Sequence, residues 1–156
     1  MKRFAFRLET LLRIRGLYEE EAERRFREAL RRLALAVDRL EELRNELAAI
    51  VGELLDLRRR GTGLQIQMLF QNYIVSLRRR IDVQLAAVRT AEIAVERRRE
   101  ELLERMKERK TMDQLKVRDY DRYLVELRRF EQKVVDDLAT LRGGGFDLES
   151  FQGAAL

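Results

Sequence analysis

The chain has 156 residues, of which 33 are Lys or Arg and 28 are Asp or Glu, and it lacks proline, cysteine, tryptophan and histidine. The absence of proline and the abundance of charged residues are typical of long helices. Without histidine or cysteine, imidazole bases, thiolate nucleophiles, disulfides and the usual zinc sites are excluded. We therefore expect a protein that is not an enzyme and that uses no cofactor or metal.

The first predicted element is a helix from about residue 7 to residue 60. Its apolar side chains recur at alternating steps of three and four, the pattern of a coiled coil with apolar a and d positions. We call the line of these positions the seam, and we expect Arg44 to occupy one of them. Upstream, a slip in phase near Ala22 predicts a stutter. The expected apolar seam residues are Leu8, Leu11, Tyr18, Ala22, Phe26, Leu30, Leu33, Val37, Leu40, Leu47, Val51 and Leu54.

A turn at residues 61–63 separates this helix from a second one, predicted from about residue 64 to residue 142. Gly61 or Gly63 is expected to take the left-handed conformation that closes the first helix. Because the connection is short, the two helices must fold back antiparallel. The predicted fold is all-α, an antiparallel two-helix coiled coil over residues 1–142 with a flexible tail at 143–156. The expected second seam is Phe70, Ile74, Leu77, Ile81, Leu85, Val88, Val95, Leu102 and Met106.

The second helix is longer than the first, and this difference is the main functional signal. Pairing around Thr62 puts residues opposite each other when their numbers add to roughly 124, so the helix beyond about Tyr123 has no partner. We call residues 124–142 the overhang. It keeps an apolar stripe that a lone helix would not expose to water. The overhang folds back, pairs with a second copy, or binds a different protein. Its stripe is Leu124, Leu127, Phe130, Val134, Leu138 and Leu141.

Two other features bear on partners. Arginine triplets at 58–60, 78–80 and 97–99 suggest nucleic acid, but the last two point in different directions and no aromatic platform accompanies them. Between Lys107 and Gln114 the only apolar side chain is Met112, which predicts either a local loosening or a polar patch that faces a partner. We expect no nucleic-acid binding. Because no run of 18 apolar residues exists, we also expect no membrane span and a cytoplasmic location.

Two stretches resemble the FliJ family of flagellar export proteins. The first is FAFRLETLLRIR at residues 4–15, followed by the acidic run at 19–23. The second is FEQKVVDDLA at residues 130–139, where Asp137 replaces the glutamate usual in the family. The resemblance also covers the overall length, the two-helix pattern and the position of the turn.

The resemblance implies a stalk and adaptor of the flagellar type III export apparatus, peripheral to the membrane through its partners. Those partners would be the hexameric export ATPase, the cytoplasmic ring of the export gate and export chaperones. The equivalent stalk of a virulence-type secretion system and a self-associating structural coiled coil are the alternatives. The resemblance assigns ATPase binding to Phe4, Phe6, Leu8, Leu127, Phe130, Lys133, Leu138 and Leu141. It assigns gate binding to Phe70, Tyr73 and Leu77.

Overall fold

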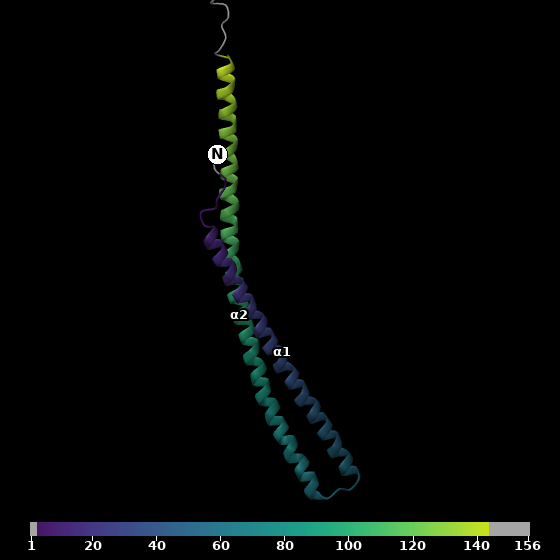
Figure 1. The fold of residues 1–156 in the computed structure, drawn as a ribbon. Coiled ribbons are helices and arrows are strands. Elements are labelled where there is room, and N and C mark those ends of the chain that lie inside the picture. The colour runs from purple at the N-terminus through teal and green to yellow at the C-terminus, as the bar shows by residue number, and fades with distance from the viewer. Residues whose placement is uncertain (1–2, 144–156) are drawn as a thin grey trace, which may run out of the picture. The chain divides into compact units, whose positions relative to one another are not determined.

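The structure, a computed structural model, describes residues 3–143 and consists there of two helices, α1 (Glu9–Arg59) and α2 (Leu64–Gly143), shown in Figure 1. They contain 51 and 80 residues. A short turn joins them, so the predicted antiparallel hairpin with a longer second helix is confirmed. The tail expected at 143–156 lies, after Gly143, outside the described residues.

The turn is closed by a Schellman motif around Gly61. Gly61 has a φ of 75°, the left-handed conformation that glycine adopts at little cost. Its N–H donates to the carbonyl of Arg58 at 3.2 Å, and the N–H of Thr62 donates to the carbonyl of Leu57 at 3.2 Å. These two bonds satisfy carbonyls that the end of α1 would otherwise leave unpaired. The hydroxyl of Thr62 donates to the same Leu57 carbonyl at 2.9 Å, which holds the turn further.

The chain divides into two compact units, and each is described by itself. The hairpin unit is residues 14–109, which contains most of α1, the turn and the first half of α2. The terminal unit joins the two ends of the chain, residues 1–13 and 110–156. Of the latter, the structure describes residues 3–13 and 110–143.

In the hairpin unit, the α1 seam follows one unbroken alternation of three and four residues. Leu33, Leu40, Leu47 and Leu54 lie where predicted, but the positions expected at Leu30, Val37, Arg44 and Val51 fall one residue earlier. Leu43, only 3% exposed, occupies the place predicted for Arg44. No stutter occurs at Ala22, because the same steps continue upstream through it. The buried and half-buried seam positions are Arg15, Glu19, Ala22, Phe26, Ala29, Leu33, Ala36, Leu40, Leu43, Leu47, Ile50, Leu54 and Leu57.

This register corrects the predicted seam for a physical reason. Leu30 and Val37 were expected inside because they are larger than their neighbours Ala29 and Ala36, yet both are exposed and the alanines face α2. A charged guanidinium in the seam would lose its hydration without a partner, so shifting the register to bury Leu43 is favourable.

The α2 seam agrees better with the prediction. Ile74, Leu77 and Val88 are buried, whereas Met106, predicted inside, is exposed. One seam position is polar and was not predicted: the side-chain amide of Gln84 donates to the backbone carbonyl of Ala36 at 2.8 Å. The seam therefore tolerates a polar side chain where a backbone acceptor is within reach.

At the end of the hairpin unit away from the turn, ion pairs rather than apolar side chains connect α1 and α2. Arg15 contacts Glu108 at 2.8 Å, and Arg109 contacts Glu19 at 3.3 Å. The guanidinium of Arg105 lies over the ring of Tyr18, 5.4 Å from its centroid. The residue numbers of each cross-helix pair add to within about five of 124, as antiparallel pairing around Thr62 predicts. The polar stretch after Lys107 is continuous helix, and Glu108 and Arg109 within it contact α1.

Candidate partner-binding surfaces

In the terminal unit, the segment before α1 packs against α2. The ring of Phe4 meets that of Tyr120 edge-on, with centroids 5.1 Å apart, and lies 5.6 Å from that of Tyr123. Phe6 is buried at 7% exposure. Lys116 of α2 forms an ion pair with Glu9 at 2.7 Å. The contacts recorded for this segment reach along α2 as far as Tyr123.

Beyond these contacts the side chains of the overhang are exposed to solvent. From Arg128 to Leu141 every side chain is exposed, including Leu138 at 56% and Leu141 at 74%. The steps of three and four along the helix bring the apolar side chains onto one face. We call this face the overhang strip; it consists of Leu127, Phe130, Val134, Leu138 and Leu141. It is the unpartnered apolar face of the terminal unit.

The polar side of the overhang carries the Glu131-Gln132-Lys133 block. Helical periodicity places Lys133 about 120° around the helix from Leu127, so coiled-coil packing does not require it. The side-chain amide of Gln132 donates to Asp136 at 3.0 Å, an i,i+4 bond on the helix surface. Within the described residues Lys133 forms no ion pair, so its ammonium group remains available to an acidic partner.

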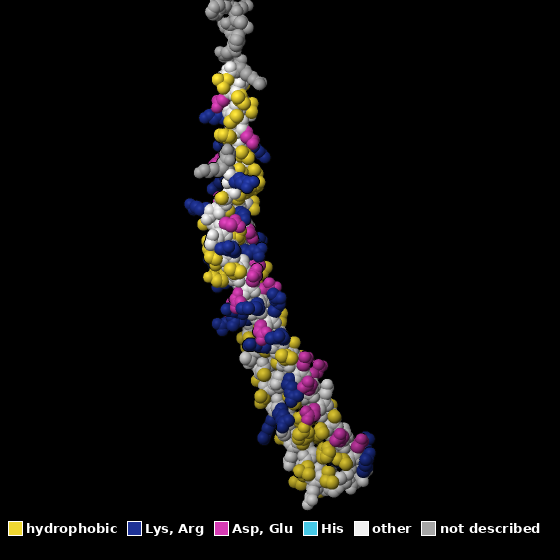
Figure 2. All heavy atoms as spheres, in the orientation of Figure 1, with side chains coloured by type: hydrophobic (Ala, Val, Ile, Leu, Met, Phe, Trp, Pro, Cys, Tyr) yellow, Lys and Arg dark blue, Asp and Glu magenta, His cyan; other side chains and the backbone are white. Residues whose placement is uncertain are grey.

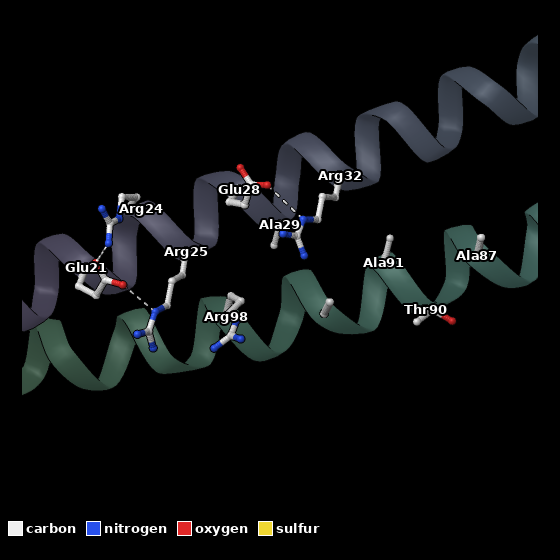
Figure 3. Close-up of a pocket in the computed structure, with 11 residues that line it drawn as sticks. Glu21, Arg24, Arg25, Glu28, Ala29, Arg32, Ala87, Thr90, Ala91 and Arg98 are labelled. Atoms are coloured by element: carbon white, nitrogen blue, oxygen red, sulfur yellow. Dashed lines mark hydrogen bonds and ion pairs between the residues drawn. The ribbon is translucent and has the colours of Figure 1, made fainter.

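A groove of about 810 Å³ lies between α1 and α2 in the hairpin unit, and Figure 3 shows Ala29 and Ala91 pointing into the space between the helices. Its rim is neutralised by local ion pairs. Glu21 pairs with both Arg24 and Arg25, and Glu28 contacts Arg32 at 3.1 Å. Burial opposes ionisation of Glu21, but its bonds to the two arginines outweigh this and lower its pKa. The groove is thus a shallow channel over alanines whose charged rim is held in ion pairs.

Neither of the two helices is long and apolar enough anywhere in its described residues to cross a membrane. Across residues 3–143 the acidic side chains also form no cluster of the kind that holds a metal ion.

The family described as "Flagellar FliJ protein" matches the chain over residues 4–144. The chain belongs to the FliJ family. This is a non-catalytic family of structural and adaptor proteins, and membership supports a stalk or adaptor kind of role in type III secretion. No curated protein gives a significant match. Among solved structures the chain is similar to the YscO homologue CT670 of Chlamydia trachomatis, with a TM-score of 0.63 and 22% identity, covering 97% of this chain and 100% of that one.

In this FliJ-family chain the residues assigned to ATPase binding fall into two groups. Phe6 is buried within the terminal unit, and Phe4, Leu8 and Leu127 are half-buried. The exposed members are Phe130, Lys133, Leu138 and Leu141. Only the second group offers surface to a partner without rearrangement, and it lies entirely on the overhang.

The residues assigned to gate binding also differ in access. Leu77 is fully buried at 0% exposure and packs the seam, so it offers no surface. Phe70 is half-buried and Tyr73 is exposed. The Tyr73 hydroxyl donates to Glu46 across the hairpin, and this bond raises the pKa of Tyr73 above its ordinary value of 10.0. The sequence could have predicted that Tyr73 lies near Glu46, because their residue numbers add to 119, within five of the 124 expected for antiparallel pairing around Thr62.

Proposed function

We propose that this FliJ-family protein is a stalk and adaptor of the flagellar type III export apparatus, and that its overhang docks into the hexameric export ATPase. The support is the family match over residues 4–144 together with the exposed overhang strip. The protein works in the cytoplasm and reaches the inner-membrane export apparatus through its partners. On the same proposal, Phe70 and Tyr73 contact the cytoplasmic ring of the export gate, and the protein escorts export chaperones.

The observation that carries the proposal is the bare apolar face at Phe130, Leu138 and Leu141. Burying one such side chain fully is worth about 1.5–3 kcal/mol relative to leaving it in water. Three of them supply several kcal/mol, enough to anchor a helix in a hydrophobic groove after the cost of ordering it. Lys133, on another side of the helix, adds a charge that selects the orientation.

Two variants test the overhang. Truncation after Leu127 removes the exposed part of the strip but keeps the contact between Phe4 and Tyr123. The double variant Leu138→Gln, Leu141→Gln keeps the helix and removes only apolar surface. Both are expected to lose binding to the purified export ATPase hexamer and stimulation of its turnover. The matched control is Ile93→Gln, which changes an equally exposed apolar residue of the hairpin unit. Normal ATPase binding by the truncated chain would show that the overhang is not the docking site.

A second candidate is self-association, since the same strip can bury itself against another copy. Light scattering on the full-length protein separates the two: a stable homodimer that Leu138→Gln, Leu141→Gln dissolves favours pairing between copies. A stalk of a virulence-type secretion system is the third candidate, and the likeness to a YscO homologue keeps it open. The genes that neighbour this one distinguish a flagellar from a virulence system.

A further inference from the structure

The net positive charge of the protein is concentrated at the turn of the hairpin. Residues 57–81, which we call the turn tip, contain six arginines and no acidic residue. The remaining chain carries 27 basic and 28 acidic residues, so elsewhere the charges balance. The part of α1 beside the turn tip adds Glu46, Glu53 and Asp56, so residues 43–81 together carry seven arginines and three acidic residues, and this end of the hairpin keeps an excess of positive charge.

The arginines of the turn tip are largely unpaired. All six are exposed, and only Arg59 forms an ion pair within the described residues, with Asp56 at 3.6 Å. In the body of the hairpin unit, by contrast, arginines such as Arg25, Arg32 and Arg98 are each paired with a glutamate. An unpaired group of arginines attracts an anionic surface with little competition from its own protein.

Exposed apolar side chains surround these arginines, and Figure 2 shows hydrophobic side chains gathered at the turn end of the hairpin. Leu64 is 73% and Leu69 is 67% exposed, and Met68 lies between them on the first two turns of α2. Helical periodicity places Leu64 and Met68 on the same face of α2 and Leu69 about 100° further around, so the three cover one side of its first two turns. Farther along, Leu55 and Val75 line a groove of about 330 Å³ between Arg58 and Arg78.

A surface with exposed aliphatic side chains and unpaired arginines matches one kind of partner. Nucleic acid would use the arginines but has no use for exposed Leu and Met, and the one exposed aromatic side chain of the turn tip, Tyr73, has its hydroxyl bound to Glu46. An anionic lipid bilayer uses both, because its phosphates attract guanidinium groups and the acyl chains beneath accept apolar side chains. We propose that the turn tip binds directly to an anionic membrane surface, with Leu64, Met68 and Leu69 inserted at the headgroup boundary.

The test is flotation of the full-length protein with vesicles that contain no other protein. One set contains phosphatidylcholine with a quarter phosphatidylglycerol, and the other contains phosphatidylcholine alone; each is run at 50 and 300 mM NaCl. We expect binding to the anionic vesicles that weakens with salt, and little binding to the neutral ones. Each arginine near a charged bilayer contributes about fivefold in partitioning, so Arg78→Gln, Arg79→Gln, Arg80→Gln should lower binding about a hundredfold.

Matched controls separate the turn tip from other exposed surfaces. Leu64→Gln, Leu69→Gln should lower binding strongly, whereas Ile93→Gln should not, although all three side chains are similarly exposed. Arg89→Gln removes an exposed arginine outside the tip and is expected to cost at most a few-fold. All these side chains are exposed, and helical circular dichroism verifies folding.

Three results would overturn the proposal. The first is equal binding to anionic and neutral vesicles. The second is no binding to either at low salt, which would leave the turn tip with only the gate contact proposed for Phe70 and Tyr73. The third is loss of vesicle binding in the overhang variant Leu138→Gln, Leu141→Gln while the tip variants bind normally. This experiment is independent of ATPase docking, because no ATPase is present.

Discussion

Replacing Leu43 by alanine tests the register of the hairpin, because the sequence pattern and the structure disagree at this position. The structure buries Leu43 at 3% exposure and leaves Arg44 exposed, whereas the sequence pattern expects Arg44 in the seam. The change removes three carbon atoms from the interior. At about 0.8 kcal/mol per buried carbon their transfer to water costs ~2.4 kcal/mol. The cavity left behind raises the expected destabilisation to about 3 kcal/mol.

The matched control is Arg44→Ala. Arg44 forms no ion pair within the described residues, so its removal should change the free energy of unfolding by at most ~0.5 kcal/mol. Thermal unfolding followed by circular dichroism at 222 nm measures both variants. For a chain of this size 1 kcal/mol shifts Tm by about 2–4 °C, so Leu43→Ala should lower Tm by roughly 6–12 °C. Equal shifts for the two variants, or a larger shift for Arg44→Ala, would refute the register.

Three further perturbations follow from the same structure. Below about pH 4.5 the hairpin should lose stability, because the bonds from Arg98 to Glu101 and from Arg105 and Arg15 to Glu108 hold the pKa of each carboxyl below its ordinary 4.5. A carboxyl whose pKa is lower in the folded than in the unfolded state stabilises the fold at higher pH, and this stabilisation is lost as the pH falls through the folded-state pKa. The double variant Glu101→Gln, Glu108→Gln should therefore make Tm depend less on pH in the acid range. Gly61→Ala should cost about 1 kcal/mol in urea unfolding, since φ is 75° there. Gly52→Ala, inside α1 where an added Cβ meets no atom within 4 Å, should stabilise by up to ~1 kcal/mol. Phe4→Ala removes two ring contacts, and hydrogen exchange should become faster before α1 begins but stay unchanged in the hairpin unit.

How far the seam is predictable from sequence depends on the position. Leu33, Leu40 and Leu47 are apolar residues with charged or small neighbours, so periodicity alone places them. Between them two adjacent residues compete, and hydrophobicity favours the larger one, Val37 over Ala36. The structure chooses the smaller, because one register must serve the whole helix and only this one buries Leu43. To choose between two adjacent residues such as Ala36 and Val37, the burial of apolar side chains must be compared over the whole helix for each register, and not at one position at a time.

The turn was predictable in kind but not in detail. Both Gly61 and Gly63 suit a helix end, and which one takes the left-handed conformation depends on where α1 actually stops. Arg59 is its last residue, which puts Gly61 at the position that the Schellman motif requires. Gly63 instead precedes α2, where its carbonyl accepts the N–H of Gln67 at 3.4 Å.

At the N-terminal end of the described chain, the residue roles implied by the family resemblance disagree with the packing. The family resemblance assigns Phe4 and Phe6 to a partner, yet the structure packs Phe4 on Tyr120 and buries Phe6. Pairing around Thr62 already placed Phe4 opposite Tyr120, so the signal was in the sequence. The exposed part of the overhang needed no such correction, since the length difference between the helices alone predicts it.

In a hairpin of two helices the seam residues hold the helices together. The residues that contact a partner must therefore lie off the seam or beyond its end. Leu77 is a seam residue, so its truncation should lower the free energy of unfolding before it lowers the affinity for any partner. Leu138 and Leu64 lie outside the seam and are exposed. Their replacement by glutamine should therefore change binding and leave Tm unchanged. A variant series that scores each residue for both Tm and binding therefore separates the two roles. A Leu77 variant that lost gate binding with an unchanged Tm would show that this division between packing and recognition does not hold.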